Sequence, residues 1–173
     1  STIEQNIKKS FSSKKISSNK YQNYGKIPII DQSPQFICGY TNDIDYLIKY
    51  EKKPYIVFGD HSCTLKLVNF DFARGADGTQ IIICENENIN QYYFYFAIKN
   101  IKLSSSYERH YKYLKDSKII IPNNVNLTNK FEIITDSVYT NIRKNIQENN
   151  LLISLRDFLL PMLMNGQIRI AAE

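Results

Sequence analysis

Residues 55–82 read YIVFGDHSCTLKLVNFDFARGADGTQII, and this stretch decides the class of fold. Three runs rich in β-branched and other apolar residues, at 54–60, 64–69 and 79–84, have the length and composition of short strands. Turn-forming residues separate these runs, most densely in RGADG at 74–78. We therefore predict β structure at the centre of the chain.

Further elements flank this stretch on both sides. GKIPIID (25–31) and QFICGYTND (35–43) are bounded by glycine, proline and other turn-forming residues, which predicts two more strands. QYYFYFAIKNIKL (91–103) is long enough for a helix packed on the sheet, although a strand also fits it, and SKIIIP (117–122) predicts a short strand. The sequence therefore predicts an α+β domain, with mixed α/β structure and short twisted strands.

A long amphipathic helix is predicted after this domain. Apolar residues recur at steps of three and four between Phe131 and Met162, until Pro161 disturbs the helix and Asn165-Gly166 ends it. At about 1.5 Å per residue such a helix is roughly 45 Å long, which exceeds the width of a small domain. Its apolar stripe therefore needs a second helix, as in a coiled coil, or must lie across its own sheet. We expect pairing with a helix of a second chain through Phe131, Ile134, Val138, Ile142, Leu152, Leu155 and Leu159.

These elements divide the chain into a globular domain at 1–128, a helical arm at 129–168 and a tail at 169–173. With 173 residues and 43% hydrophobic content, we expect one substantial core. No run of about 18 apolar residues indicates a membrane span, and the first residues lack the apolar run of a secretory signal. We therefore expect a cytoplasmic protein.

The basic charge is concentrated near the start of the chain. Of a net charge of +5, residues 1–26 hold six lysines against Glu4, whereas the rest balances sixteen basic against sixteen acidic residues. Lysines among serine and asparagine could lie along a phosphate backbone, or could simply belong to a solvated, partly frayed terminus. A second basic concentration, at 99–118, is interleaved with tyrosines. This mixture is typical of nucleic-acid binding and also of a half-buried strand edge or loop.

The motifs of common enzyme classes are absent. The chain has no GxxxxGK[ST], GxGxxG or HExxH motif, and no Asn-Pro-Pro-aromatic segment like that of adenine methyltransferases. Asp60-His61-Ser62 names three hydrolase residues, but neighbours in a strand point to opposite faces, so we expect no catalytic triad. His61 and Cys63 could share a face, yet His110 is the only other histidine, so we expect no metal site. The three widely spaced cysteines predict reduced thiols.

Four segments carry a resemblance to a known family. They are GKIPIIDQSPQFICGYTND (25–43), YIVFGDHSCTLKLVNFDFARGADGTQII (55–82), YERHYKYLKDSKIIIPN (107–123) and SLRDFLLPMLMNGQI (154–168). In order and spacing they resemble the specificity subunits of type I restriction-modification enzymes. The resemblance implies a non-catalytic target-recognition domain that reads half of a bipartite double-stranded DNA site, and a helix that sets the separation between half-sites.

The family normally carries two such domains and two helices in one chain, whereas this sequence holds one of each. We therefore expect either a natural half-subunit or an excised piece of bacterial or archaeal origin. In both cases we expect antiparallel pairing of two copies, a homodimer that reads a palindromic, interrupted site. The resemblance also implies a methyltransferase (M) subunit that binds S-adenosylmethionine and a restriction (R) subunit that uses ATP and Mg. We expect no cofactor in this chain.

The candidate DNA contacts combine amide, aromatic and basic side chains. Arg109 is suited to bidentate pairing with guanine, whereas two alternatives stay open for His110 and Lys112: they contact phosphates, or they brace the fold as shared features of the family. Gln35 and Asn42 could read adenine or thymine edges, but such residues also populate turns. The candidate set is Lys14, Lys15, Lys20, Gln35, Tyr40, Asn42, His61, Tyr107, Arg109, His110 and Lys112.

Two other functions stay open from the sequence. One is an interaction scaffold that mainly docks methyltransferase subunits through its helix, and the other is a small hydrolase that uses Asp60, His61 and Ser62. DNA binding predicts a steep dependence of affinity on salt. Scaffolding predicts protein binding without DNA, and the hydrolase predicts loss of activity in His61→Ala.

Overall fold

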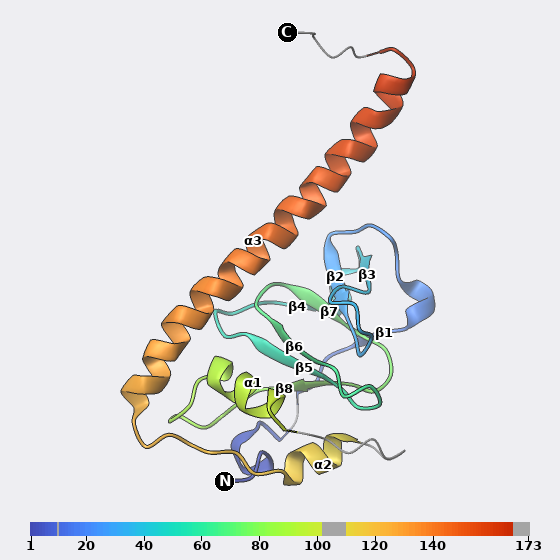
Figure 1. The fold of residues 1–173 in the computed structure, drawn as a ribbon. Helices are drawn as coiled ribbons and strands as arrows, with labels where there is room; N and C mark the ends of the chain where they lie inside the picture. Colours follow the sequence, from blue (N-terminus) through green and yellow to red (C-terminus); the bar gives the residue numbers. More distant parts are fainter. Residues whose placement is uncertain (10, 102–109, 168–173) are drawn as a thin grey trace. The chain divides into compact units, whose positions relative to one another are not determined.

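The computed structural model describes residues 1–9, 11–101 and 110–167. By its internal contacts the chain divides into two units, the first at Ser1–Asp136 and the second beginning at Ser137. The predicted α+β class with a long C-terminal helix is confirmed (Figure 1). The strands are β1 (Lys15–Ile16), β2 (Ile27–Ile30), β3 (Gly39–Thr41), β4 (Leu47–Ile48), β5 (Tyr55–Gly59), β6 (Leu65–Val68), β7 (Phe72–Gly75) and β8 (Thr79–Ile82). The helices are α1 (Gln91–Lys99), α2 (His110–Asp116) and α3 (Val125–Met164), with short 3-10 helices η1 (Glu4–Asn6), η2 (Ser18–Lys20) and η3 (Ile44–Tyr46).

The strands form two small sheets. In the first, β7 is central: β2 runs parallel along one edge, and β4 and β1 pair one after the other along the opposite edge. β3 extends this sheet antiparallel to β2. In the second sheet β5 lies between β6 and β8, and both pairings are antiparallel. Because all the strands are short, each sheet depends on side-chain packing against other elements for its stability.

The main core lies between the two sheets. The first sheet contributes Ile30, Ile48 and Phe72 to one buried cluster, and the second contributes Val57, Val68 and Ile81. A second cluster, with Ile16, Ile27, Ile29 and Ala73, covers the opposite face of the first sheet. Helix α1 contacts β5 and β6 of the second sheet. Both faces of each sheet are therefore at least partly covered, which explains the near-continuous apolar runs in the strands.

Local patterns predicted most elements but not all. The predicted segments contain β2, β3, β5, β6, β8 and α1, and a strand at 91–103 is ruled out in favour of a helix at Gln91–Lys99. The predicted strand at 117–122 is wrong, because Lys118 alone forms a β-bridge, to Thr2. The pairing does not extend further, since the segment that contains Thr2 enters the 3-10 helix η1 at Glu4. The predicted turn at 74–78 begins too early. Arg74 and Gly75 belong to β7, where pairing on both edges overrides their turn propensity.

The N-terminal segment is packed into the first unit rather than frayed. Ile3, Ile7 and Ile16 are buried, and Ile3 is fully so. The backbone N–H of Ile3 donates to the Ser117 carbonyl at 2.9 Å, and that of Lys8 donates to the Ile83 carbonyl at 2.9 Å. The alternative of a frayed terminus is therefore wrong for these residues, because their apolar side chains have a place in the core.

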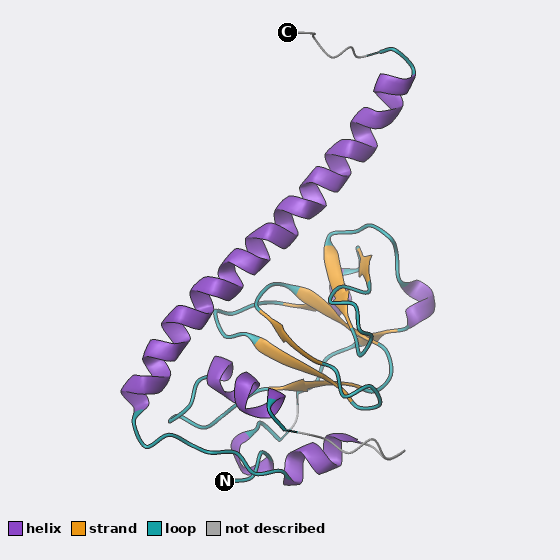
Figure 2. Cartoon of the chain, in the orientation of Figure 1, coloured by secondary structure: helices purple, strands orange, loops and turns teal. Residues whose placement is uncertain are grey.

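Helix α3 begins and ends at recognisable signals. The Asn124 side chain accepts from the Asn126 N–H at 3.0 Å at its start. The helix continues through Pro161, whose missing N–H removes a single backbone bond near the end, and it stops before Gly166, which has a positive φ of 69°. Figure 2 shows α3 as one continuous helix. Its end at Asn165-Gly166 is as predicted, whereas its start is several residues earlier.

The first turns of α3 belong to the first unit and pack on α1. The Phe131 ring lies edge-on to the rings of Tyr93 and Phe96, with centroids 6.3 and 5.6 Å away. The Tyr92 hydroxyl donates to the Asp136 carboxylate at 2.5 Å. Phe131, predicted as part of the pairing stripe, therefore has aromatic partners within its own unit.

The rest of α3 carries many exposed apolar side chains. They are Val138, Ile142, Leu151, Leu152, Ile153, Leu155, Phe158, Leu160, Leu163 and Met164, whereas Leu159 is half-buried. Ile134, at the end of the first unit, is also exposed. Exposed apolar side chains gathered on one helix are unusual for an isolated chain and indicate a surface that a partner covers.

Phe72→Ala tests the packing of the two sheets against each other. Because the ring is fully buried in the main core, we expect the free energy of unfolding to fall by about 3 to 5 kcal/mol in urea titrations followed by circular dichroism. Ile44→Ala, at a side chain that is 73% exposed, is the control and should change it by less than about 0.5 kcal/mol. A loss in Phe72→Ala as small as that of the control would contradict the sheet packing.

Candidate nucleic-acid interface

Gln32 joins two turns that are distant in the sequence. Its carbonyl accepts hydrogen bonds from the Ser62 hydroxyl at 2.6 Å and the Thr64 hydroxyl at 2.9 Å. Its side-chain oxygen accepts from the His61 N–H at 3.3 Å. Both ends of the turn after β5 are thereby tied to the segment after β2, so the turn has little freedom to move.

The turn between β7 and β8 packs against the same group. Gly78 has a positive φ of 73°, and a Cβ there would lie 2.8 Å from both the Gln32 side-chain oxygen and the His61 ring. Only glycine fits this position without a shift. The buried Arg74 side chain bridges this turn, because its Nε donates to the Thr79 carbonyl at 2.9 Å. We name residues 31–35, 60–64 and 76–78 the turn cluster.

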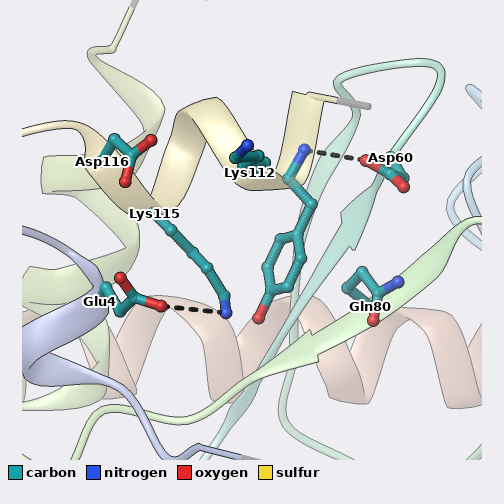
Figure 3. A pocket seen from close by; sticks show the side chains of 7 residues that line it. Glu4, Asp60, Gln80, Lys112, Lys115 and Asp116 are labelled. Carbon is teal, nitrogen blue, oxygen red and sulfur yellow. Dashed lines mark hydrogen bonds and ion pairs between the residues drawn. The ribbon is translucent and has the colours of Figure 1, made fainter. Parts of the chain in front are cut away.

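Asp60 connects the turn cluster to α2. Its carboxylate accepts from the Tyr111 N–H at 2.8 Å, its carbonyl accepts from the His110 N–H at 3.3 Å, and its own N–H donates to the Gly78 carbonyl at 2.8 Å. The carboxylate, drawn in Figure 3, thus satisfies a backbone donor in the first turn of α2. Residues 110–116 are helical rather than the loop or strand edge that the basic and aromatic mixture at 99–118 allowed, and a distant side chain satisfies one of the backbone donors of this helix.

A hollow of about 380 Å³ lies beside α2. The α2 side chains Tyr111, Lys112, Lys115 and Asp116 line it, together with Glu4, Asp60 and Gln80 from other segments (Figure 3). Lys115 pairs with Glu4, with 3.4 Å between nitrogen and oxygen. Lys112 is exposed, whereas His110 is buried at 7% exposure, so of these two candidates only Lys112 has a side chain open to solvent.

Within the turn cluster, the Asp31 side chain is the centre of a second hydrogen-bond network. This carboxylate accepts from the Tyr21 hydroxyl at 3.1 Å, the Ser33 N–H at 2.8 Å and the Cys38 thiol at 2.7 Å. The Tyr21 hydroxyl also accepts from the Ala76 N–H at 3.2 Å. Burial would raise the pKa of Asp31, but the hydrogen bonds from Cys38, Ser33 and Tyr21 outweigh it, so that the pKa is lowered.

Lys66 is a buried cation next to this network. Its ammonium donates to the Gln35 carbonyl and lies 3.9 Å from the Cys38 sulfur. Burial lowers the pKa of Lys66 and raises the pKa of the Cys38 thiol. Both groups therefore brace the segment after β2 rather than face solvent.

The predicted basic residues of the N-terminal segment are exposed. Lys14 pairs with Asp45 at 2.6 Å, Lys15 lies in β1, and Lys20 ends η2 next to Tyr21. The carboxylate of Asp45 partly neutralises Lys14. Lys20 is exposed and directly precedes Tyr21, whose hydroxyl bonds to Asp31 and Ala76 of the turn cluster.

The remaining candidates fall into separate places. Tyr40 lies in β3, and the exposed Asn42 bonds to the Lys26 N–H at 3.1 Å and the Gln22 side chain at 3.2 Å. Exposed Gln35 and His61 belong to the turn cluster. Tyr107 and Arg109 lie outside the described residues. Sequence reasoning missed Gln32, Asp31 and Tyr21, whose roles rest on contacts between distant segments that no local pattern signals.

Asp60, His61 and Ser62 are not arranged for hydrolysis. They lie in a turn rather than in the predicted strand, the Asp60 carboxylate caps α2, and the Ser62 hydroxyl donates to the Gln32 carbonyl. Within residues 1–9, 11–101 and 110–167, no cluster of His, Cys, Asp and Glu is placed to hold a metal ion. None of the helices in those same ranges combines the length and hydropathy of a membrane span.

Comparisons with known proteins agree with the resemblance seen in the sequence. No family model matches the chain. Over 83 residues it is 29% identical to the type I restriction enzyme EcoR124I/EcoR124II specificity subunit of Escherichia coli, which is 47% of this chain and 20% of that protein. Its fold is similar to that of a type-I restriction-modification system S subunit from M. genitalium, with a TM-score of 0.57 and 18% identity over 92% of this chain and 43% of the other.

The chain therefore spans less than half the length of the relatives that it matches. The likeness to specificity subunits is confirmed, in sequence over part of the chain and in fold over nearly all of it.

Asp31→Asn tests the network that holds the turn cluster. Because the folded-state pKa of Asp31 is below its usual value, its ionised form stabilises the fold above about pH 4, and this contribution is lost as the pH falls through the folded pKa. We expect the variant to be less stable by about 1 to 2 kcal/mol near pH 7 and the difference to shrink toward pH 2 in urea titrations.

Asp45→Asn is the matched control, because the pKa of Asp45 is also lowered, by the hydrogen bond from Lys14, but the pair is exposed. No comparable pH-dependent loss is expected there. Equal behaviour of the two variants would show that Asp31 does not hold the cluster.

Proposed function

We propose that this chain is the DNA-recognition half of a type I specificity subunit. It reads one half of a bipartite double-stranded DNA target and directs methyltransferase and restriction subunits to it. The observation that carries the proposal is the fold shared with an S subunit over 92% of the chain, together with the sequence match to a second specificity subunit. The exposed polar turns beside basic segments support it.

The proposed division of labour leaves the chemistry to other chains. The Asp60 and Ser62 side chains are engaged in holding turns, so the chain contributes positioning rather than a reaction. S-adenosylmethionine would bind to the methyltransferase subunit, and ATP and Mg to the restriction subunit. Because the proposed target is cellular DNA, the protein would act in the cytoplasm of a bacterial or archaeal cell.

The proposed pairing surface is the exposed apolar part of α3. From Leu151 to Met164 apolar residues occupy nearly all positions, interrupted by Ser154, Arg156 and Asp157. A helix that is apolar on most of its sides is stable in water only when other protein surfaces bury more than one of those sides. We propose that a second copy pairs antiparallel along one side, as a homodimer, and that a methyltransferase subunit covers another.

The same apolar surface favours the alternative function, an interaction scaffold that docks methyltransferase subunits through its helix. The two functions differ in what the first unit does. A scaffold has no need of DNA affinity, whereas the specificity subunit binds duplex DNA with a preferred sequence. Duplex binding by the isolated chain therefore separates them.

DNA binding is tested by the salt dependence of affinity. We expect the chain to bind a fluorescent duplex, with log K falling linearly against log salt at a slope of about 0.9 per phosphate contact. Lys112→Ala should weaken binding for every duplex sequence and reduce that slope by about 1. Lys49→Ala, at an exposed lysine after β4, is the matched control and should leave the slope unchanged. No binding at low salt would overturn the proposal and favour the scaffold.

Helix pairing is tested by solution mass. We expect light scattering at micromolar concentration to give twice the 20.2 kDa of the chain, and the monomer mass after Leu152, Leu155 and Leu159 are all changed to Glu. The matched control changes Asn141, Asn145 and Gln147 to Glu, which adds the same charge at exposed polar positions of α3 and should preserve the dimer. A monomer in the wild type would exclude pairing of two copies.

A further inference from the structure

The turn cluster differs in charge from the segments on either side of it. Its three stretches, DQSPQ at 31–35, DHSCT at 60–64 and ADG at 76–78, contain no lysine or arginine. The exposed residues include His61, Ser62 and Asp77. A surface with an exposed carboxylate and no cation is unsuited to phosphates, but amide, hydroxyl, imidazole and carboxylate groups all suit the hydrogen-bonding edges of bases.

Basic residues stand on both sides of the cluster. On one side, Lys20 is next to Tyr21, whose hydroxyl bonds to Asp31 and Ala76. On the other side, Lys112 is next to Tyr111, whose N–H is bonded to Asp60. In Figure 1 the short blue helix η2 and the beginning of α2 lie toward opposite ends of the first unit, with the turns after β7 and β5 between them in this view. The order is therefore basic, neutral-to-acidic and basic.

We propose that the turn cluster is the base-reading part of the interface and that His61 is a specificity-determining residue within it. This proposal rests on the proposed DNA-binding function. Phosphate contacts from the lysines on either side would position the duplex, and the cluster between them would face the base edges in a groove.

His61 is the best-placed reader of the cluster. Its side chain is exposed, and its ring lies so close to Gly78 that a Cβ at that glycine would be 2.8 Å from the ring carbon Cδ2. Its backbone is held by Gln32, so the imidazole stands on a fixed turn. One ring nitrogen of a neutral imidazole donates and the other accepts, which allows a hydrogen bond to a guanine or adenine acceptor or to an amino group of a base.

The experiment is selection from a pool of duplexes with a randomised central region, using the full chain, followed by sequencing of the bound fraction. We expect the wild type to enrich a short motif. His61→Ala and His61→Asn should lose the preference at one or two positions of that motif by about 5- to 100-fold. Lys112→Ala should instead lower binding to all sequences and keep the motif.

The outcomes separate the two proposals. If the wild type binds the pool without enriching any motif, or fails to bind it, the proposed function fails and this inference fails with it. If the wild type enriches a motif that both His61 variants reproduce in full, the DNA-binding function stands and the role of His61 is overturned. Urea titrations of the His61 variants should match the wild type, which excludes unfolding as the cause of a changed motif.

Discussion

The hydrogen bonds that the Gln32 carbonyl accepts from Ser62 and Thr64 hold the exposed surface of the first unit together. Without them the turn after β5 would have no fixed relation to the segment after β2, and His61 would have no defined direction. Asp60, in the same turn, fixes the start of α2 through the Tyr111 N–H. A single tied turn thus connects the turn cluster with the lysines of α2.

One buried charge supports this arrangement. Lys66 is buried and Asp31 is half-buried, and both belong to one network with the Cys38 thiol between them. A buried charge is costly unless it is hydrogen-bonded, and Lys66 donates to the Gln35 carbonyl. These hydrogen bonds also define the orientation of the turn, because a hydrogen bond depends on direction whereas an apolar contact does not.

Sequence patterns predicted those elements whose residues alone define them, without a contact from a distant segment. The strands in the runs at 54–60, 64–69 and 79–84 were visible because apolar residues alone define them, and α3 because its period extends over many turns. Helix α2 was not predicted, since the side chain that satisfies its Tyr111 N–H is that of Asp60, some fifty residues earlier. For the same reason His61 and Lys112 could be named from composition, but their connection through Asp60 and Gln32 could not.

The charge distribution bears on why such a domain would work in pairs. After residue 26 the acidic and basic residues cancel, so the net positive charge of one copy is confined to its first 26 residues. A single copy would then gain only modest affinity from its net charge. Joining two copies through α3 would make the second contact intramolecular, and the effective concentration then multiplies two weak affinities without any new contact. Under the proposed pairing, a turn cluster that contains no lysine or arginine would take its affinity from two joined contacts rather than from added positive charge.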